Sequence, residues 1–236
     1  MIQDKKIIIL LGPPGSGKGT QATLLAEKLD LFYFETSNII EAAVKNHRPD
    51  EYLEVDGQKY TFGHEKELWE GGILCSPPFV VALVEKKINE LFQLGEGIIF
   101  SGSPRTLHEG EKIMPQIEAM YGKENIKVIL LELSAEQTIF RNSNRKICEL
   151  MRHPVLYNEE TKNLEHCPLD GSKLLKRAGL DDQETIKVSI KEYQGRTFPL
   201  VEFLEKRGIA VKRVNGEQSV GAVFKDIMRA LLPITN

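Results

Sequence analysis

A chain of 236 residues is long enough for one large domain or for a core with inserted subdomains. Charged residues make up 28% of it, and a formal net charge of −3 predicts no broad basic surface for nucleic acid. No apolar run approaches a membrane span, and residues 1–6 lead straight into a predicted strand without room for a signal peptide. We therefore expect a cytoplasmic protein that binds neither membrane nor nucleic acid. Three cysteines favour metal binding or packing over a disulfide framework.

The first predicted strand, residues 7–11, leads into a glycine-rich loop and a helix start. Gly12, Gly17 and Lys18 match most of the P-loop pattern, although Gly19 stands where that pattern has Ser or Thr, and the hydroxyl follows at Thr20. Backbone N–H groups and the helix dipole then point at one place, which stabilises an anion, and Lys18 adds a full positive charge. The loop predicts a phosphate-binding site, and a tight turn that binds nothing is the alternative.

The next segments alternate between helical and strand patterns. Apolar spacing predicts a helix over 18–29, a short strand over 31–34 and a further helix that begins at the N-cap cluster 36–38. Residues 46–72 are polar and irregular, and we interpret them as an excursion from the core. A helix is expected after Ser76 and Pro77, followed by a buried strand over 97–100 that runs into the loop 101–106. Because ligands collect at the carboxyl ends of parallel strands, we expect this loop beside the phosphate loop.

The second half of the chain continues the alternation around another irregular segment. A strand over 128–133 precedes a helix whose capping box pairs Ser134 with Gln137. Periodicity disappears over 148–177, which indicates an inserted subdomain, and returns in a long helix that Pro199 bends or divides. A strand over 209–214 and a closing helix complete the chain. This order predicts an α/β fold: a parallel sheet with helices on both faces and right-handed crossovers.

Several motifs, in their order along nearly the whole chain, resemble the adenylate kinase family. They are the Lys-Gly-Thr loop, Gly-x-Pro-Arg-Thr at 102–106, two arginines before the second insertion, Cys-x-x-Asp-Gly at 167–171, the acidic run 181–185 and Asn-Gly at 215–216. The resemblance implies an ATP:AMP phosphotransferase with a P-loop core over residues 1–35, 76–147 and 177–236. It also implies a nucleoside-monophosphate-binding insertion at 36–75, a lid at 148–176, and closure of both over the substrates of a monomer.

The resemblance also implies roles for individual residues. Phosphoryl transfer needs alignment of donor and acceptor and cancellation of charge on the transferring oxygens, which arginines and Mg²⁺ bound with ATP supply. Catalytic roles fall to Lys18, Arg105, Arg141, Arg145 and Arg177. ATP would be bound by Gly15, Ser16, Gly17, Lys18, Gly19, Thr20, Arg145 and Gln218. AMP would be bound by Thr36, the backbone near Cys75, Gly102, Arg105 and Arg177.

The acceptor side departs from the family pattern. Glu41 stands where the family has a phosphate-binding Arg, and Ser101 and Asn38 replace acids that organise water around Mg²⁺. Glu109 replaces a Gln that reads the acceptor base, and Ser189 an Arg after the lid. The segment 45–69 is also longer than in the family.

Two interpretations of these departures remain open. In the first, Lys45, Arg48 or another cation of the longer segment supplies the missing charge and AMP is phosphorylated. In the second, the protein binds nucleotide with weak or no turnover, or uses another nucleoside monophosphate. The intact donor loop and its arginines favour the first.

The lid poses a question about metal. Relatives hold it with zinc through two Cys-x-x-Cys or Cys-x-x-Asp pairs, and Cys167 with Asp170 fits the second pair. Cys148 begins the first pair, where a two-residue insertion would make His153 the next ligand. Two thiolates, an imidazole and a carboxylate suit tetrahedral Zn²⁺. A lid without metal, with His153 and His166 as surface residues, is the alternative, and Cys75 is expected to be a packed thiol.

Overall fold

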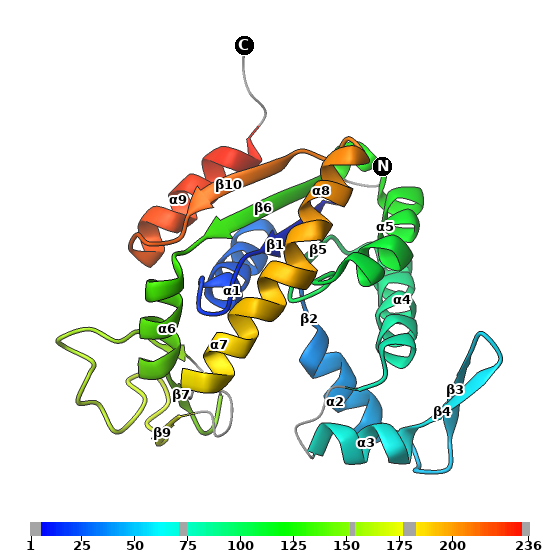
Figure 1. Ribbon diagram of the computed structural model, residues 1–236, viewed down its shortest axis with the longest axis horizontal. Coiled ribbons are helices and arrows are strands. Elements are labelled where there is room, and N and C mark those ends of the chain that lie inside the picture. Colours follow the sequence, from blue (N-terminus) through cyan, green and yellow to red (C-terminus); the bar gives the residue numbers. More distant parts are fainter. Residues whose placement is uncertain (1–5, 71–74, 152–153, 177–182, 233–236) are drawn as a thin grey trace. The chain divides into compact units, whose positions relative to one another are not determined.

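The computed structural model describes residues 6–70, 75–151, 154–176 and 183–232. His153, Arg177 and the acidic residues 181–182 lie outside the described residues. The central sheet has five strands in the order β10-β6-β1-β5-β2, which are Val211–Asn215, Ile126–Glu132, Ile7–Leu11, Ile98–Ser101 and Phe32–Glu35. The pairs β1–β5 and β5–β2 are parallel. The α/β class with a parallel sheet flanked by helices is thereby confirmed (Figure 1).

The centre of the sheet is formed by strands without a polar face. All five side chains of β1 are buried, as are all four of β5. A strand covered on both faces needs such a continuous apolar run, and β-branched residues favour the extended backbone. The register places Leu10 opposite Ser101, and Ser101 opposite Glu35, so the carboxyl ends of these three strands are level.

Helices follow the strands in the expected alternation. The first half of the chain contains α1 Lys18–Leu29, α2 Thr36–Asn46, α3 Phe62–Glu70, α4 Pro77–Leu94 and α5 Leu107–Tyr121, with a 3-10 turn at Lys123–Asn125. The second half contains α6 Ala135–Asn144, α7 Gln183–Glu192, a π-helical turn at Tyr193–Thr197, α8 Phe198–Lys206 and α9 Val220–Leu231. Pro199 has no N–H to donate to the carbonyl four residues earlier, and the π-helical turn interrupts the α-helical hydrogen bonding just before it. The backbone stays helical at Glu192 and Phe198 on either side of this turn.

The chain forms two compact units. Unit 1 comprises Met1–Leu10, Ala22–Val128 and Pro199–Val211, and unit 2 comprises Leu11–Gln21, Ile129–Phe198 and Lys212–Asn236. The predicted monophosphate-binding insertion falls in unit 1, and the predicted lid falls in unit 2.

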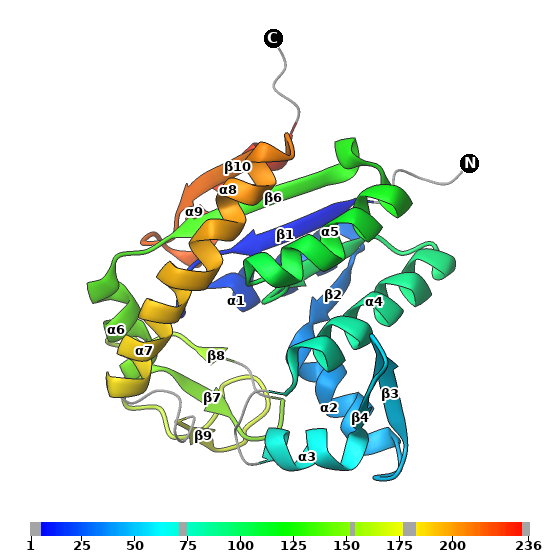
Figure 2. The ribbon, with the colours of Figure 1, turned by 45° about the vertical axis from the view of Figure 1, so that its right-hand side comes forward.

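Unit 1 contains a β-hairpin where the sequence indicated irregular structure. Strands β3 Tyr52–Val55 and β4 Gln58–Thr61 pair antiparallel, and α3 follows directly. The hairpin turns through Asp56 and Gly57, which both have positive φ. Figure 2 shows the hairpin, α2 and α3 gathered near the start of α4. Their apolar side chains form one cluster: Ile40, Ala43, Val44, Phe62, Cys75, Phe79 and Leu83. The expectation of irregular structure over 46–72 was therefore wrong for the described part of that segment.

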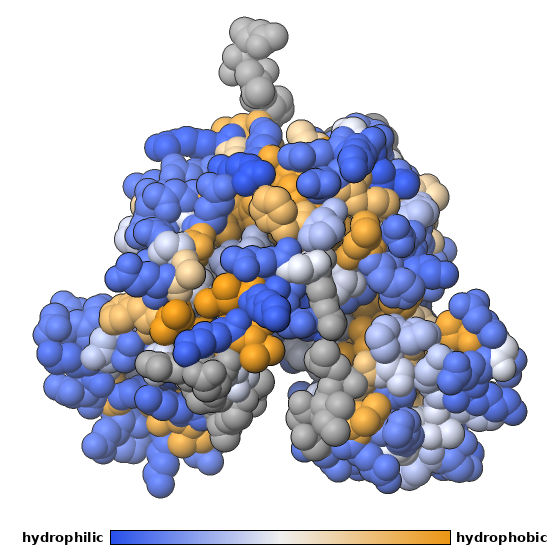
Figure 3. Space-filling view, viewed as in Figure 1, coloured by the Kyte–Doolittle hydropathy of each residue, from blue (hydrophilic) through white to orange (hydrophobic). Residues whose placement is uncertain are grey.

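Unit 2 contains a small antiparallel sheet in the predicted lid, with strand order β8-β7-β9. Its strands are short: Pro154–Val155, Lys146–Cys148 and Leu174–Leu175. In Figure 3, hydrophobic side chains gather over α7 on an otherwise largely hydrophilic face, and Val188 of this helix is 60% exposed.

Candidate active site

The phosphate loop lies between the end of β1 and the first residue of α1, Lys18. Gly12 has a φ of +147°, and a Cβ there would lie 2.6 Å from the carbonyl oxygen of Leu131. Any other residue would therefore be strained and would collide with the neighbouring strand. The hydroxyl of Ser16 is buried and has no partner among the described residues. The loop thus keeps the tight path and the helix start that the sequence predicted.

Lys18 folds back into this loop. Its Nζ donates to the carbonyl oxygens of Gly12 at 2.6 Å and Pro13 at 2.9 Å. Burial, and to a smaller extent the positive charge of Arg145, lower the pKa of Lys18 from 10.5 to about 8. An anion in the loop would oppose both effects, so the site favours a negatively charged ligand.

Helix α6 brings two arginines of unit 2 to the loop. The Nη1 atom of Arg141 donates to the carbonyl oxygen of Gly15 at 3.5 Å. Arg145 at the C-terminal end of α6 donates to the side-chain oxygen of Asn142 and lies close enough to Lys18 to affect its pKa. Three positive side chains predicted from the sequence therefore gather at one loop within unit 2.

A negative side chain accompanies the arginine nearest the loop. Glu217 accepts a hydrogen bond at 2.8 Å from the backbone N–H of Ser134, the N-cap of α6, and these contacts lower the pKa of Glu217. Burial lowers the pKa of Arg141, and the charge of Glu217 opposes that effect. Gln218, predicted to border the ATP base, donates from Nε2 to Asp226 at 2.8 Å and to the carbonyl of Asn215 at 3.1 Å.

The loop after β5 carries Arg105 in unit 1. Gly102 has a φ of +101°, and the Ser103–Pro104 peptide bond is cis. Glu109 in the first turn of α5 holds this loop, because its carboxylate accepts from the Arg105 N–H at 3.0 Å and the Ser103 hydroxyl at 3.3 Å. The Arg105 Nε lies 3.6 Å from the same carboxylate. Glu109 therefore supports the arginine in this structure.

The start of α2 differs from the expectation at one point. The helix begins at Thr36, and its N-cap is Glu35, without a side-chain capping bond. The hydroxyl of Thr36 is buried and has no partner among the described residues. One turn further, Glu41 forms an ion pair at 2.5 Å with Lys45. The acid that replaces the expected arginine thus has a cation beside it.

Of the remaining residues discussed for the acceptor side, one is buried and one forms a surface ion pair. Cys75 is buried, donates from its thiol to the carbonyl of Glu65 at 3.5 Å, and has a pKa raised to about 11 by burial, which confirms a packed thiol. Arg48 pairs with Glu51 at 3.1 Å on the surface. Ser189 lies in the middle of α7 in unit 2.

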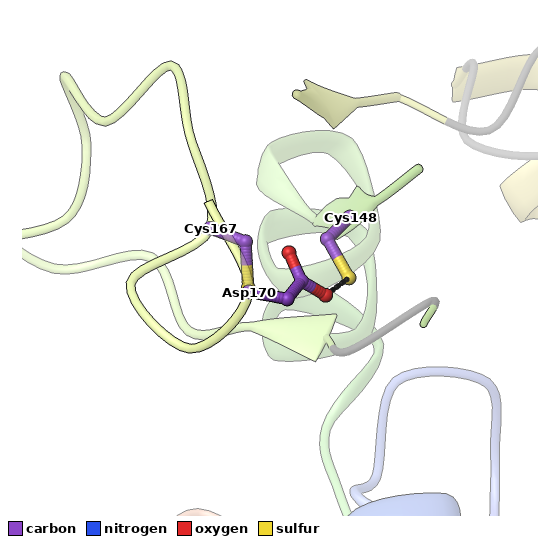
Figure 4. Close-up of side chains that lie close together, drawn as sticks. All are labelled: Cys148, Cys167 and Asp170. Atoms are coloured by element: carbon purple, nitrogen blue, oxygen red, sulfur yellow. Dashed lines mark hydrogen bonds between the residues drawn. The ribbon is translucent and has the colours of Figure 1, made fainter. Parts of the chain in front are cut away.

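Three of the predicted zinc ligands come together in the lid. The ligand atoms of Cys148, Cys167 and Asp170 all lie within 4.8 Å of one another (Figure 4). The Cys148 thiol donates to the Asp170 carboxylate at 3.1 Å, and this bond lowers the pKa of Asp170. Two sulfurs and a carboxylate oxygen at this spacing fit a tetrahedral Zn²⁺ site. His153, the predicted fourth ligand, lies outside the described residues.

Sequence reasoning missed three residues that shape these sites. Asn142 is buried beneath the phosphate loop, Glu217 faces Arg141, and Glu65 is buried in α3, where it accepts from the N–H of Ser76 at 2.9 Å. The sequence contains one indication of the role of Asn142: it is a polar residue four positions after Thr138, so both lie on the same, buried side of the helix. The sequence contains no such indication for Glu217 or Glu65, because their partners are not their neighbours in the sequence.

A glycine loop at the end of a central parallel strand, with a lysine and two arginines around it, defines a P-loop phosphate-binding protein. The sequence model of the family described as adenylate kinase matches residues 10–209. An adenylate kinase of Novosphingobium aromaticivorans is 33% identical over 210 residues, 89% of this chain and 91% of the relative. One of Methanothrix thermoacetophila is 29% identical over 228 residues, 95% of this chain and 97% of the relative. The chain belongs to the adenylate kinase family and is a phosphotransferase. Among the described residues, no helix is both long and apolar enough to span a membrane.

Proposed function

We propose that the protein transfers the terminal phosphoryl group of ATP to AMP and forms two molecules of ADP. The observation that carries this proposal is the set of three cations, Lys18, Arg141 and Arg145, around the phosphate loop of an adenylate kinase family member. Their side chains carry the charge that a transferring phosphoryl group needs cancelled.

On the donor side, the backbone from Gly15 to Thr20 would hold the ATP phosphates at the N-terminus of α1. An entering phosphate would replace the loop carbonyls as the partner of Lys18 and favour its charged form. Arg141 and Arg145 would bind oxygens of the same phosphates, as planar guanidinium groups do well. Mg²⁺, which arrives with ATP, neutralises phosphate charge, and the Thr20 hydroxyl is an oxygen donor of the kind that it accepts.

On the acceptor side, Arg105 would bind the AMP phosphate from the loop that Glu109 supports. Thr36, Gly102 and the backbone near Cys75 would face the rest of the nucleotide. Both candidate cations are paired with an acid, but only Lys45 lies on α2 beside Glu41, the position at which the family has an arginine, whereas Arg48 lies beyond the end of that helix. We therefore propose Lys45 as the acceptor cation. We further propose that the insertion 36–75 and the lid 148–176, with Arg177, close over both substrates and exclude water.

Initial rates of ADP formation with MgATP and AMP, GMP, CMP or UMP test this function. The fastest turnover is expected with AMP. Arg141→Ala should lower kcat/KM by at least tenfold, since a hydrogen bond from a charged group contributes about 1.5–3 kcal/mol. Lys206→Ala is the control, because Lys206 is an exposed cation on α8 in unit 1 and pairs at 3.7 Å with Glu202 on the surface. No ADP at saturating AMP and Mg²⁺ would refute the enzyme, and faster turnover with another monophosphate would change the acceptor.

We also propose that Cys148, His153, Cys167 and Asp170 bind one structural zinc ion. The three described ligands are close enough together and have the right chemistry. Protein purified without added zinc is expected to contain about one zinc per chain, and Cys148→Ser and His153→Asn should each lower that content. His166→Asn is the control that should keep it. A zinc content near zero in the wild type would remove this proposal.

The protein is further proposed to act as a monomer in the cytoplasm. Its family membership supports this expectation. Sedimentation velocity should give a single species near the chain mass of 26.7 kDa, and a stable dimer would contradict it.

A further inference from the structure

The amide of Asn142 lies between the phosphate loop and Arg145, at a position for which the proposed function gives no role. Its side chain is only 2% exposed. Its Nδ2 donates to the carbonyl oxygen of Thr138 at 2.7 Å, and its Oδ1 accepts from the guanidinium of Arg145. The first bond fixes the amide against α6, so the oxygen is held in one direction. A buried amide that is bonded on both sides is a rigid support.

The same side chain touches the phosphate loop. An added Cβ on Gly15 would lie 2.6 Å from Asn142 Nδ2 and 3.3 Å from its Cγ. The neighbouring Arg141 donates to the Gly15 carbonyl at 3.5 Å. Asn142 therefore packs against the loop at the residue that Arg141 binds. A movement of the amide would therefore displace both the loop and the guanidinium of Arg145.

The chemistry of an amide suits this position. A free arginine side chain has many rotamers, and fixing it costs conformational free energy when a ligand binds. A neutral oxygen acceptor orients the guanidinium without cancelling its charge, whereas a carboxylate would compete with phosphate for it. The guanidinium of Arg145 is thus held near Lys18, whose pKa its charge lowers.

We propose that Asn142 is a positioning residue that holds the guanidinium of Arg145 at the phosphate loop in the orientation that receives the ATP phosphates. This role rests on the proposed function, because it assumes that Arg145 binds ATP. Asn142 itself does not touch the reacting atoms. Its effect passes through Arg145, which makes the inference testable by a double-mutant cycle.

The cycle measures MgATP binding by isothermal titration calorimetry for the wild type, Asn142→Leu, Arg145→Ala and the double variant. Leucine keeps a similar volume but removes both bonds. Asn142→Leu is expected to weaken MgATP binding about tenfold, in line with loss of a bond to a charged group. In the Arg145→Ala background, the same change should alter binding less than about twofold, because the group that it positions is gone.

Asn144→Leu is the matched control. Asn144 lies on the same helix and makes the same kind of bond, from Nδ2 to the carbonyl of Phe140 at 2.9 Å, but on the exposed side. It should leave binding unchanged in both backgrounds. Circular dichroism and the unfolding temperature establish that each variant folds, and Asn142→Ala replaces Asn142→Leu in the cycle if the leucine variant does not fold.

Each outcome decides the inference. An equal loss with and without Arg145 would show that Asn142 supports the fold generally and would overturn the positioning role. Unchanged binding in Asn142→Leu would overturn it as well. If the wild type itself does not bind MgATP, the proposed function fails and this role with it; if the wild type binds and the cycle is additive, only the role of Asn142 fails.

Discussion

Removal of the Lys18 ammonium should change how the stability of the free protein depends on pH. The pKa of Lys18 falls from 10.5 to about 8 in the folded chain, mainly because burial disfavours the charge. Between these two values the unfolded chain binds more protons at this residue than the folded chain does. The free energy of unfolding must therefore rise with pH in this window and stay flat below it. Lys18→Met removes the titrating group and so removes this contribution.

The size of the effect follows from the two pKa values. One pKa unit corresponds to about 1.4 kcal/mol, so the contribution from pH 7 to pH 9.5 is about 2 kcal/mol. Urea unfolding of the wild type and Lys18→Met over this range measures it, because groups common to both proteins cancel in the difference. The wild-type curve is expected to gain about 2 kcal/mol over the variant curve as pH rises. Parallel curves, or a gain in the opposite direction, would refute the burial of a destabilised ammonium in the loop.

Four further substitutions test local features. Gly15→Ala and Gly17→Ala should each lower the free energy of unfolding by about 1–2 kcal/mol, because both positions have positive φ. Urea unfolding should show the larger loss for Gly15→Ala, because a Cβ at Gly15 would collide with Asn142, whereas a Cβ at Gly17 would have open space. Ser134→Ala should cost about 1 kcal/mol in the same assay, because the Ser134 hydroxyl caps α6 by accepting from the N–H of Gln137; an unchanged midpoint would argue against the cap. Glu109→Ala should raise the KM for AMP several-fold and leave the KM for ATP unchanged, because Glu109 holds the acceptor-side loop in unit 1, and equal changes in both would contradict that assignment.

Local chemistry made much of the fold predictable from the sequence. The apolar run of β1 and the glycines after it determine a buried strand and a loop almost by themselves. The serine cap of α6 and the left-handed Gly95 that ends α4 also act within one turn of the chain. Pro199 interrupts the α-helical hydrogen bonding because of its own missing N–H. Each of these features depends on neighbours in the sequence, which is why a single chain reveals them.

Features that depend on distant partners were not predictable in the same way. The two strands of the hairpin in unit 1 have only four residues each, which is too short for their alternation to stand out in the sequence. The hairpin is stabilised by packing against α2 and α4, including Leu53 and Tyr60. Glu109 stands where the family has a Gln that reads the acceptor base, and the sequence did not reveal that its carboxylate binds the loop before its own helix. Asn142 packs against Gly15, which is far away in the sequence, so motif spacing does not reveal the contact. Motif spacing identifies which residues approach a ligand but not which residues support them.

Phosphorus NMR of the protein with Mg²⁺ and ADP alone tests the central claim most directly. An enzyme that exchanges a phosphoryl group between two adenine nucleotides must form ATP and AMP from ADP in equal amounts, without release of inorganic phosphate. We expect equal ATP and AMP signals to grow until equilibrium, and Arg141→Ala to slow their appearance at least tenfold. An unchanged ADP spectrum, or release of phosphate without AMP and ATP in equal amounts, would contradict the account.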